Sequence, residues 1–430
     1  MSKPLKIAVA GLGTVGAGLL KLLAANGPML AKRGGRPLVV TAVSARDRKR
    51  DRGVSLEGIT WFDDPVEMAA KADAEVVVEL IGGSDGAAKR TIEAAIAAGR
   101  HVVTANKALL AVHGTGLARA AEAKGLSLAY EAAVAGGIPV IKALREGVAA
   151  NRVTRVYGIL NGTCNYILTV MRESGRAFDD VLAEAQKLGY AEADPAFDID
   201  GIDAAHKLAI LAGVAFGTEV NFRAIHVEGI RHVDAIDMTF AGQLGYRIKL
   251  FGIAQLTDHG VEQRVHPCMV PLDSPIAHVE DVFNAVVIEG DFVGSTVYEG
   301  RGAGAGPTAS AVAADLLDLA AGRRVYTFGV PATQLAALPA SPMDRHRGAY
   351  YIRLMVTDRP GVIADVTAAL RDEQVSLESM LQRGRQPNQM VPVVLTTHET
   401  EEAAMVRALK RIASLSTVLQ PPRMIRIEQF

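Results

Sequence analysis

Apolar runs alternate with helix-like patterns over the first 130 residues. The runs are short and rich in Val, Ile and Ala, which is typical of strands buried on both faces of a sheet. Between them, apolar residues recur at helical spacing, and the first helix is predicted to stop at Gly27-Pro28. Strands that alternate with helices predict an α/β unit with a parallel sheet over residues 1–130. Its predicted strands are 6–10, 37–43, 75–81 and 100–104, and its predicted helices are 17–26 and 87–98.

The middle of the chain, residues 131–330, changes to longer strands with alternating positions. Several of these strands follow one another directly, which indicates antiparallel pairing. We expect helices to cover one face, which gives an α+β domain built on an open sheet. The other face of such a sheet could form a dimer interface. The predicted strands are 152–160, 246–256, 261–270, 285–290 and 294–299, and the predicted helices are 165–171, 178–188, 201–216 and 309–320.

The last segment, residues 349–430, reads as a small βαββαβ domain of the ferredoxin-like type. A turn, Asp358–Val362 (DRPGV), joins its first strand to its first helix. Residues 331–348 carry three prolines and a glycine and are predicted to be a linker. The predicted strands are 349–356, 376–382, 390–396 and 423–427, and the predicted helices are 363–372 and 401–414.

Composition narrows the class of protein. Of the 430 residues, 49% are hydrophobic and 22% are charged, which is ordinary for a globular chain with a large core. The formal net charge of −1 argues against nucleic acid or an anionic membrane as a partner. Cys164 and Cys268 form no metal-type pair, so we expect a reducing cytoplasm. No apolar run reaches the ~18 residues of a membrane span, and the start of the chain does not resemble a secretory leader.

A glycine-rich segment lies between the first strand and the first helix, and reads Gly11-Leu12-Gly13-Thr14-Val15-Gly16. In that position the spacing is the fingerprint of a Rossmann-type dinucleotide-binding sheet. The first glycine allows a tight turn, the second admits the pyrophosphate, and the third lets the helix pack on the strand. The helix start offers free N–H groups to phosphate. We therefore predict Gly11, Gly13, Thr14, Val15 and Gly16 as cofactor-binding residues; a glycine turn without a ligand is the alternative.

The end of the second strand bears on the choice of cofactor. An NAD site usually has an acidic residue there, which binds the ribose 2′-hydroxyl. Here the strand ends in Ser44, and a basic cluster that includes Arg46 follows. Because a 2′-phosphate needs basic partners, NADP(H) is favoured, with Arg46 as a contact. Asp47 keeps NAD(H) open, and a solvated basic loop remains the structural alternative.

The helix over 201–216 carries charge on an otherwise apolar surface, with Asp200 as its predicted N-cap. Asp203 and Lys207 stand four residues apart and share a face with the apolar Ile210. A charged pair on such a face is expected to be buried or to line a cleft. Buried charge marks structural ion pairs as well as active sites, so an ordinary ion pair is the alternative.

Three loops lie where a Rossmann-type sheet and its neighbour would bind ligands. Lys107 follows the strand that ends at Thr104, and ligands sit outside the carboxyl ends of parallel strands. It could contact cofactor or substrate, or be a surface lysine that starts the next helix. The Gly136-Gly137 loop could hold a monovalent cation through backbone oxygens, although a hinge is favoured on this pattern alone. Residues 300–308 form a second glycine-rich loop, which could close over the cofactor or be a plain connector.

The acidic segment, residues 185–207, reads AxxxGYAxxDPxxDIxGxDxxxK and fixes many positions at set spacings. In this segment the chain resembles homoserine dehydrogenase. Further segments look like blocks of the same family, in the family's order, from residue 6 to about 325. They are GLGTVG (11–16), VELIGG (78–83), TANKALLA (104–111), YEAAVAGGIP (130–139), GILNGTCNYIL (158–168) and GAGAGPTASAV (302–312).

The resemblance implies the reduction of L-aspartate 4-semialdehyde to L-homoserine by NAD(P)H, and the reverse. Lys207 would then be the proton donor, and Lys107 would contact cofactor and substrate. Glu192 and Asp203 would bind the substrate, with Asp198 close by. Gly189 and Gly304 would lie near the cofactor. A structural sodium ion would be held by backbone oxygens of Glu131, Val134, Gly136 and Ile138.

Residues 349–430 resemble an ACT domain, a small-ligand sensor. In homoserine dehydrogenases such a domain implies feedback by L-threonine, and a dimerisation module without a ligand is the alternative. We expect a homodimer or homotetramer. Two other functions stay open at this point: a Rossmann oxidoreductase on another amino-acid aldehyde or 2-oxo acid, and an amino-acid sensor whose nucleotide domain is regulatory.

Overall fold

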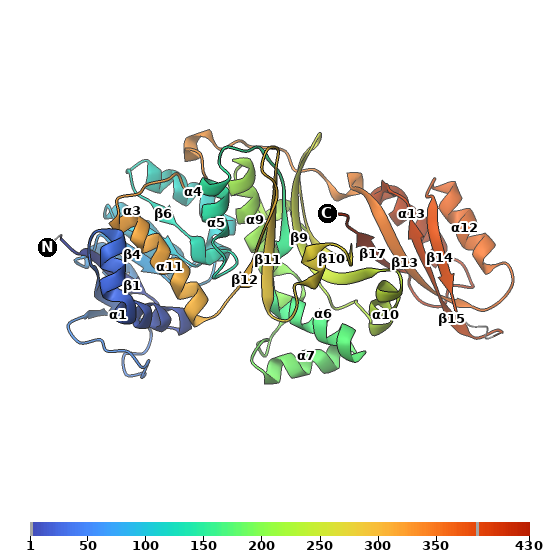
Figure 1. Ribbon diagram of the computed structural model, residues 1–430, viewed down its shortest axis with the longest axis horizontal. Helices are drawn as coiled ribbons and strands as arrows, with labels where there is room; N and C mark the ends of the chain where they lie inside the picture. The colour runs from blue at the N-terminus through green and yellow to red at the C-terminus, as the bar shows by residue number, and fades with distance from the viewer. Residues whose placement is uncertain (1–2, 384–386) are drawn as a thin grey trace.

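Six parallel strands form a sheet at the N-terminal end of the molecule (Figure 1). The alternating pattern predicts four of them, and the short strands β3 and β6 are additional. The computed structural model describes residues 3–383 and 387–430. The strand order is β3-β2-β1-β4-β5-β6, in which the order reverses beside β1, and ligands bind at such a switch point. The strands are β1 (Leu5–Ala10), β2 (Leu38–Ser44), β3 (Thr60–Phe62), β4 (Val76–Glu79), β5 (His101–Thr104) and β6 (Leu128–Ala129), and the helices between them are α1 (Thr14–Gly34), α2 (Pro65–Lys71), α3 (Ala87–Ala97) and α4 (Lys107–Glu122).

The first helix is longer than predicted. It does not stop at Gly27-Pro28 but runs to Gly34, with Pro28 inside it. A proline in a helix removes one backbone hydrogen bond. Here Leu30 is buried in the core that α1 shares with α11 (Ala305–Ala320). Burial of the last turns against that distant helix outweighs the local break.

A second, eleven-stranded sheet runs through the rest of the molecule, with β12-β11-β7-β9-β10-β17-β13-β15-β14 as its main order (Figure 1). The predicted antiparallel pairing is present, since β9 pairs with β10 and β11 with β12. The strands of the middle region are β7 (Val153–Ile159), β8 (His226–Val227), β9 (Tyr246–Thr257), β10 (Gly260–Pro271), β11 (Phe283–Gly290) and β12 (Gly294–Arg301), and its principal helices are α5 (Val140–Lys142), α6 (Gly162–Ser174), α7 (Phe178–Lys187), α8 (Ala196–Ile199), α9 (Ile202–Phe216) and α10 (Ala235–Gln243).

The C-terminal module has the predicted βαββαβ order, with one additional short strand, β16. Its four long strands lie in the order β17-β13-β15-β14, and α12 and α13 pack together over a separate apolar core. These elements are β13 (Arg347–Thr357), α12 (Val362–Asp372), β14 (Leu377–Gln382), β15 (Met390–Thr397), β16 (Thr400–Glu401), α13 (Glu402–Ala413) and β17 (Arg423–Ile427).

This module is joined to the middle region by strand pairing. Its last strand, β17, lies parallel to β10, so one sheet crosses from the middle region into the module. The segment predicted as a linker, 331–348, is also held, since Ala336 bridges to Thr218 and Ala340 to Val261. Among the described residues, no helix is both long and apolar enough to cross a membrane.

Buried ion pairs reinforce this junction. Arg264 on β10 donates to Glu262, at 2.8 Å, and to Glu428 directly after β17, at 2.7 Å. Arg353 on β13 donates to Asp237 on α10, also at 2.7 Å. All five side chains are buried. Because a buried charge is costly without its partner, these pairs favour one fixed seating of the module on the middle region.

Candidate active site

The glycine-rich turn after β1 has the geometry that a dinucleotide needs. Gly11 has φ +102°, and a Cβ there would lie 2.5 Å from the carbonyl oxygen of Leu80. A Cβ on Gly16 would lie 2.1 Å from the carbonyl oxygen of Gly11, so only glycine lets α1 pack this closely on the turn. Gly13 faces open space instead. The turn therefore leaves a gap beside the start of α1, where a pyrophosphate fits.

A cavity of about 610 Å³ opens from this turn along the ends of β1 and β2. Arg46, Arg50 and Arg52 line it together with Asp47. The Asp47 carboxylate accepts a hydrogen bond from the backbone N–H of Lys49, at 2.8 Å, and so is engaged in its own turn. Thr14 is exposed at the start of α1, outside this lining. The cavity has the position and charge of an adenosine phosphate site.

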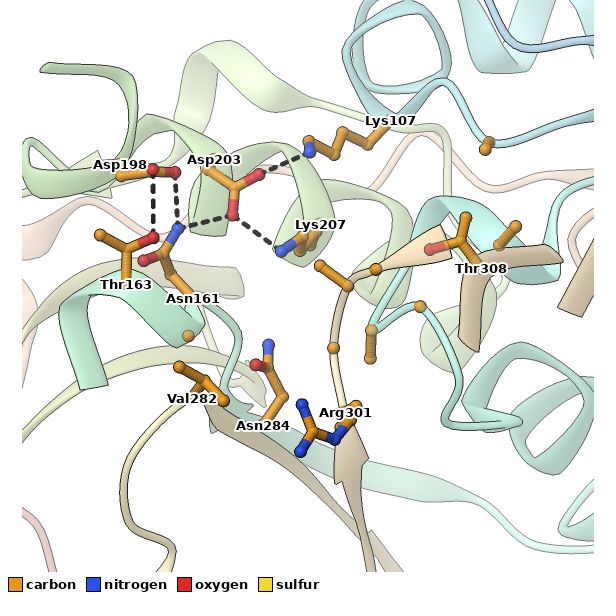
Figure 2. A pocket seen from close by; sticks show the side chains of 18 of the residues that line it. Lys107, Asn161, Thr163, Asp198, Asp203, Lys207, Val282, Asn284, Arg301 and Thr308 are labelled. Atoms are coloured by element: carbon orange, nitrogen blue, oxygen red, sulfur yellow. Dashed lines mark hydrogen bonds and ion pairs between the residues drawn. The ribbon is translucent and has the colours of Figure 1, made fainter. Parts of the chain in front are cut away.

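A second cavity, of about 570 Å³, lies between the nucleotide sheet and the middle region (Figure 2). It brings together residues that lie far apart in the chain. The glycine turn and the residues that follow β5 contribute one wall, and α6, α8 and α9 contribute the other. Of the residues predicted for the site, Val15, Lys107, Gly136, Gly189, Asp198, Asp203, Lys207 and Gly304 line it.

The carboxylate of Asp203 lies on the cavity wall and contacts three other lining residues, Lys107, Lys207 and Asn161 (Figure 2). Its Oδ1 lies 2.8 Å from Lys107 Nζ, and its Oδ2 lies 2.7 Å from Lys207 Nζ. Lys207 also donates to the backbone oxygen of Leu160, at 2.6 Å. Asn161 Nδ2 donates to Asp203 Oδ2, at 2.8 Å. One buried carboxylate thus orients two ammonium groups. An ordinary i, i+4 ion pair, which was the alternative for Asp203 and Lys207, would include only one of them.

The surroundings shift the pKa values of these groups in different directions. Burial alone would raise the pKa of Asp203, but Lys207 and Lys107 hold it well below its usual range. Burial and the neighbouring Lys107 charge lower the pKa of Lys207 despite Asp203. At Lys107, burial is outweighed by Asp203, so its pKa is raised. The Lys207 ammonium is therefore the more acidic of the two, because its pKa is lowered while that of Lys107 is raised.

Asp198 provides a second carboxylate in the cavity, and its negative charge is less compensated than that of Asp203. Asn161 Nδ2 donates to it at 2.9 Å, and the hydroxyl of Thr163 donates at 3.3 Å. Burial and the neighbouring Asp203 raise its pKa, since no ammonium group in the described chain contacts it. A cationic group of a ligand would supply the missing charge.

The start of α9 differs from the prediction, and the difference matters for the site. Asp200 does not cap the helix; it forms an ion pair with Arg231. Gly201 occupies the N-cap position with φ +84°, and a Cβ there would lie 3.1 Å from Val227. Glycine tolerates both this left-handed conformation and the close contact with Val227. The helix that starts at this turn carries Asp203 and Lys207 into the cavity lining.

Sequence reasoning missed several residues of the cavity wall. Asn161 caps α6, since its Oδ1 accepts from the N–H of Cys164, at 2.8 Å. Its amide nitrogen joins the two carboxylates, a role that its place in the sequence does not indicate. Asn284 is a lone amide in an apolar strand, a pattern that indicates a buried polar group in need of a partner. Thr163, Asn284, Arg301 and Thr308 also line the cavity.

Glu192 lies apart from this lining. It is exposed in the loop after α7, and its backbone oxygen accepts from Gln186 at 3.0 Å. Gly189, at the start of the same loop, has φ +76° and does line the cavity. Glu192 would reach a substrate only if this loop folds toward the cavity.

The loop between β6 and α5 carries the residues predicted to hold a cation. All four are buried, and Ala135 and Gly136 have φ of +55° and +50°. The Glu131 carboxylate caps α5, since it accepts from the N–H groups of Ile141 and Lys142, each at 2.9 Å. Its backbone oxygen is therefore the group left for a cation. Such a turn gathers hard oxygen donors of the kind that an alkali cation prefers.

Family models cover nearly the whole chain. The model for the homoserine dehydrogenase NAD-binding domain matches residues 11–131, that for homoserine dehydrogenase matches residues 139–317, and that for the ACT domain matches residues 350–415. Homoserine dehydrogenase of Neisseria gonorrhoeae is 45% identical over 100% of this chain and 99% of its own, and that of Pseudomonas aeruginosa is 46% identical over all of both.

Solved structures agree. The crystal structure of a homoserine dehydrogenase from Thiobacillus denitrificans is 45% identical, with a TM-score of 0.93 over 99% of both chains. A hyperthermophilic archaeal homoserine dehydrogenase in complex with NADPH is 28% identical, with a TM-score of 0.63 over 74% of this chain and 97% of its own. The chain belongs to the homoserine dehydrogenase family of NAD(P)-dependent oxidoreductases.

Proposed function

We propose that L-aspartate 4-semialdehyde is reduced to L-homoserine in the 570 Å³ cavity, with Lys207 as the proton donor. The observation that carries this proposal is the shared Asp203 carboxylate, which orients two ammonium groups beside the glycine turn. The test is the oxidation of NADPH and of NADH with aspartate semialdehyde, with and without threonine. Turnover of another amino-acid aldehyde or of a 2-oxo acid, without turnover of aspartate semialdehyde, would assign the cavity to a different substrate.

The nicotinamide cofactor supplies the hydride when it is bound. The chain's own residues handle the charge that then builds on the aldehyde oxygen. The Lys207 ammonium stabilises that oxygen and transfers a proton to it. Asp203 keeps both lysines in place, and the raised pKa of Lys107 keeps that side chain charged beside cofactor and substrate.

The substrate's α-ammonium group needs a carboxylate that is still uncompensated. Asp198 fits, because its pKa is raised and the described chain places no ammonium group against it. Asp203 is already paired with Lys107 and Lys207, so Asp198 is the carboxylate left for the substrate. Glu192 would join Asp198 only after its loop moves inward, and we propose it as a contact of the closed state.

For the cofactor we propose NADP(H), with NAD(H) as the weaker alternative. Three arginines line the cavity at the end of β2, and the single acid there, Asp47, is engaged in its own turn. The archaeal relative that was solved with NADPH supports this choice. The cofactor would then extend from Arg46, past Gly13 and Val15, to Gly304 in the central cavity.

Replacement of Arg46 by glutamine is expected to raise the KM for NADPH by about tenfold, because a charge-assisted hydrogen bond to the 2′-phosphate is lost. The KM for NADH should change far less, since NADH lacks that phosphate. Arg33, a basic residue in the last turn of α1 outside this cavity, provides the matched control as Arg33→Gln. Equal losses for both cofactors in the Arg46 variant would remove Arg46 from 2′-phosphate recognition.

We also propose a structural sodium ion at the 131–138 loop. The support is the buried left-handed turn at Ala135 and Gly136. The carbonyl of Ile138 accepts from the N–H of Val140, at 2.8 Å, and would share its second lone pair with the ion. The ion would fix the loop that lines the cavity at Gly136, and would take no part in proton transfer.

The ACT domain is proposed to bind L-threonine as a feedback inhibitor. A cavity of about 540 Å³ lies at the turn between β13 and α12, and its polar lining includes Asp358, Gln382 and Asn388. An amino acid needs a carboxylate for its ammonium group, and Asp358 supplies one. Removing the ACT domain by ending the chain near Pro339 would also remove β17 from the sheet that it shares with β10. A point substitution is therefore the better test of threonine binding.

Replacement of Asp358 by asparagine is expected to weaken threonine inhibition by about tenfold or more, and to leave kcat without threonine unchanged. The reason is the loss of the charge that faces the effector's ammonium group. Asp372→Asn, on the same module at the end of α12, is the matched control and should keep its threonine response. An unchanged inhibition constant in the Asp358 variant would place the effector elsewhere.

A homodimer or homotetramer is proposed from the long open sheet. The edge strand β12 exposes Val297, and the turn before it exposes Phe292 at 91%. Apolar groups of this size at a sheet edge favour association. A cytoplasmic location is proposed because Cys164 and Cys268 are both free and buried.

A further inference from the structure

One buried amide in the active-site cavity lacks a partner. Asn284 lies on β11, is 1% exposed and lines the cavity, but its Nδ2 has no hydrogen-bond partner in the described chain. A buried donor without an acceptor is costly, so it is retained where a ligand completes it. In Figure 2 this nitrogen points toward the space below Asp203 and Lys207.

The amide is also held rigidly. A Cβ on Gly302 would lie within 2.3–2.5 Å of all three outer atoms of the Asn284 side chain, so the Gly302 backbone lies directly on the amide. A Cβ on Gly162, at the start of α6, would lie 3.3 Å from Asn284 Oδ1. Two glycines therefore fix the amide from different elements, which is the preorganisation expected of a binding group.

A cation stands beside this amide. Arg301 is exposed and pairs with Phe283 across β11 and β12, next to the pair formed by Asn284 and Gly300. Its guanidinium lies 5.7 Å from the centre of the Phe283 ring, and its side chain lines the cavity. Within residues 3–383 and 387–430, no carboxylate lies within ion-pair distance of Arg301. Figure 2 shows both side chains on the wall opposite Asp198 and Asp203.

The cavity thus has two poles of opposite character. At the acidic pole, Asp203 is already paired with Lys107 and Lys207, so Asp198 is the carboxylate left for a ligand, and it faces a donor pole, Asn284 and Arg301. An α-amino acid carries an ammonium and a carboxylate on one carbon, and these need one pole each. We propose that Asn284 and Arg301 bind the substrate's α-carboxylate and orient its aldehyde toward Lys207. This inference rests on the proposed function, because it assumes an amino-acid substrate.

The test compares L-homoserine with two truncated alcohols, using NADP⁺. 3-Aminopropan-1-ol lacks the carboxylate, and 4-hydroxybutanoate lacks the ammonium group. Asn284→Asp and Arg301→Gln should each lower kcat/KM for homoserine by about ten- to a hundredfold, mainly through KM. For 3-aminopropan-1-ol both variants should stay within about threefold of the unmodified enzyme, because no carboxylate is there to be bound. NADPH binding, followed by fluorescence titration, should be unchanged and also reports on folding.

Asp198→Asn supplies the opposite control. It should raise the KM for homoserine and for 3-aminopropan-1-ol, which both carry an ammonium group, but not the KM for 4-hydroxybutanoate. A homoserine KM within twofold of the unmodified value in both donor-pole variants would overturn the inference, as would equal losses on homoserine and 3-aminopropan-1-ol. A selective loss of NADP⁺ affinity in Arg301→Gln would assign that residue to the cofactor instead. If the unmodified enzyme fails to oxidise homoserine at all, the proposed function itself fails.

Discussion

Replacement of Lys207 by alanine is expected to lower kcat for aspartate semialdehyde reduction by about 10²–10⁴-fold, or roughly 3–5 kcal/mol of transition-state stabilisation. The ammonium group lies 2.7 Å from Asp203 and 2.6 Å from the backbone oxygen of Leu160, inside the cavity. Its removal leaves the developing alkoxide without its proton donor. Cofactor affinity should be kept, because the nucleotide turn is made by other residues.

The pH dependence identifies which lysine gives the proton. Reduction needs a protonated donor, so the rate falls as the pH rises through the donor's pKa. Burial lowers the pKa of Lys207 from its usual 10.5, whereas Asp203 raises that of Lys107. The basic limb of the kcat profile should therefore lie below pH 10.5 if Lys207 is the donor, and above it if Lys107 is.

Lys249→Met is a matched control for the loss of a buried ammonium group. Lys249 is 1% exposed and donates to Val279 and Glu280, but it lies outside the cavity lining. Its replacement should lower stability and leave kcat per folded enzyme within about threefold. Near-normal turnover of the Lys207 variant would transfer the proton-donor role to Lys107 or to solvent.

The elements that the sequence predicted well are those with a strong local pattern. Four strands of the parallel sheet, the antiparallel strands of the middle region and the C-terminal module are present because their periodicity and turn residues act locally. The helix that continues past Pro28, and the pairing of β17 with β10, were not predictable in this way. Both depend on contacts with residues more than 150 positions away in the chain, which no local pattern encodes.

The residues of the candidate site also fall into two groups, those with a local sequence signal and those without one. Asp203 and Lys207 could be singled out because charge on an apolar helix face is unusual, and Lys107 because ligands gather at the carboxyl ends of parallel strands. The link between Lys107 and Asp203, at 2.8 Å, joins two domains and becomes visible only in three dimensions. Asn284 was hidden for a different reason: its strand reads as core, and its missing partner is a property of the packing.

The second large effect is expected on stability, at the junction of the middle region and the ACT module. Arg264→Met should lower the free energy of unfolding by about 3–5 kcal/mol, because Glu428 and Glu262 would stay buried without their cation. Arg264 is 1% exposed and lies 2.7 Å from one carboxylate and 2.8 Å from the other. Urea unfolding of the full chain, with and without the substitution, measures the loss.

Replacing Glu428 together with Arg264 shows whether stability is lost through an unpaired buried charge or through lost packing of the arginine side chain. In the double variant Arg264→Met/Glu428→Met, the carboxylate after β17 is gone, and Glu262 keeps the imidazole of His346 at 3.2 Å. Burial would raise the pKa of Glu262, but His346 and Arg264 together lower it to about 2, so the histidine continues to stabilise the charge. Most of the lost stability should therefore return, as it does when buried ion pairs are replaced by apolar residues. If the double variant is as unstable as the single one, packing of the Arg264 side chain, rather than its charge, holds the module in place.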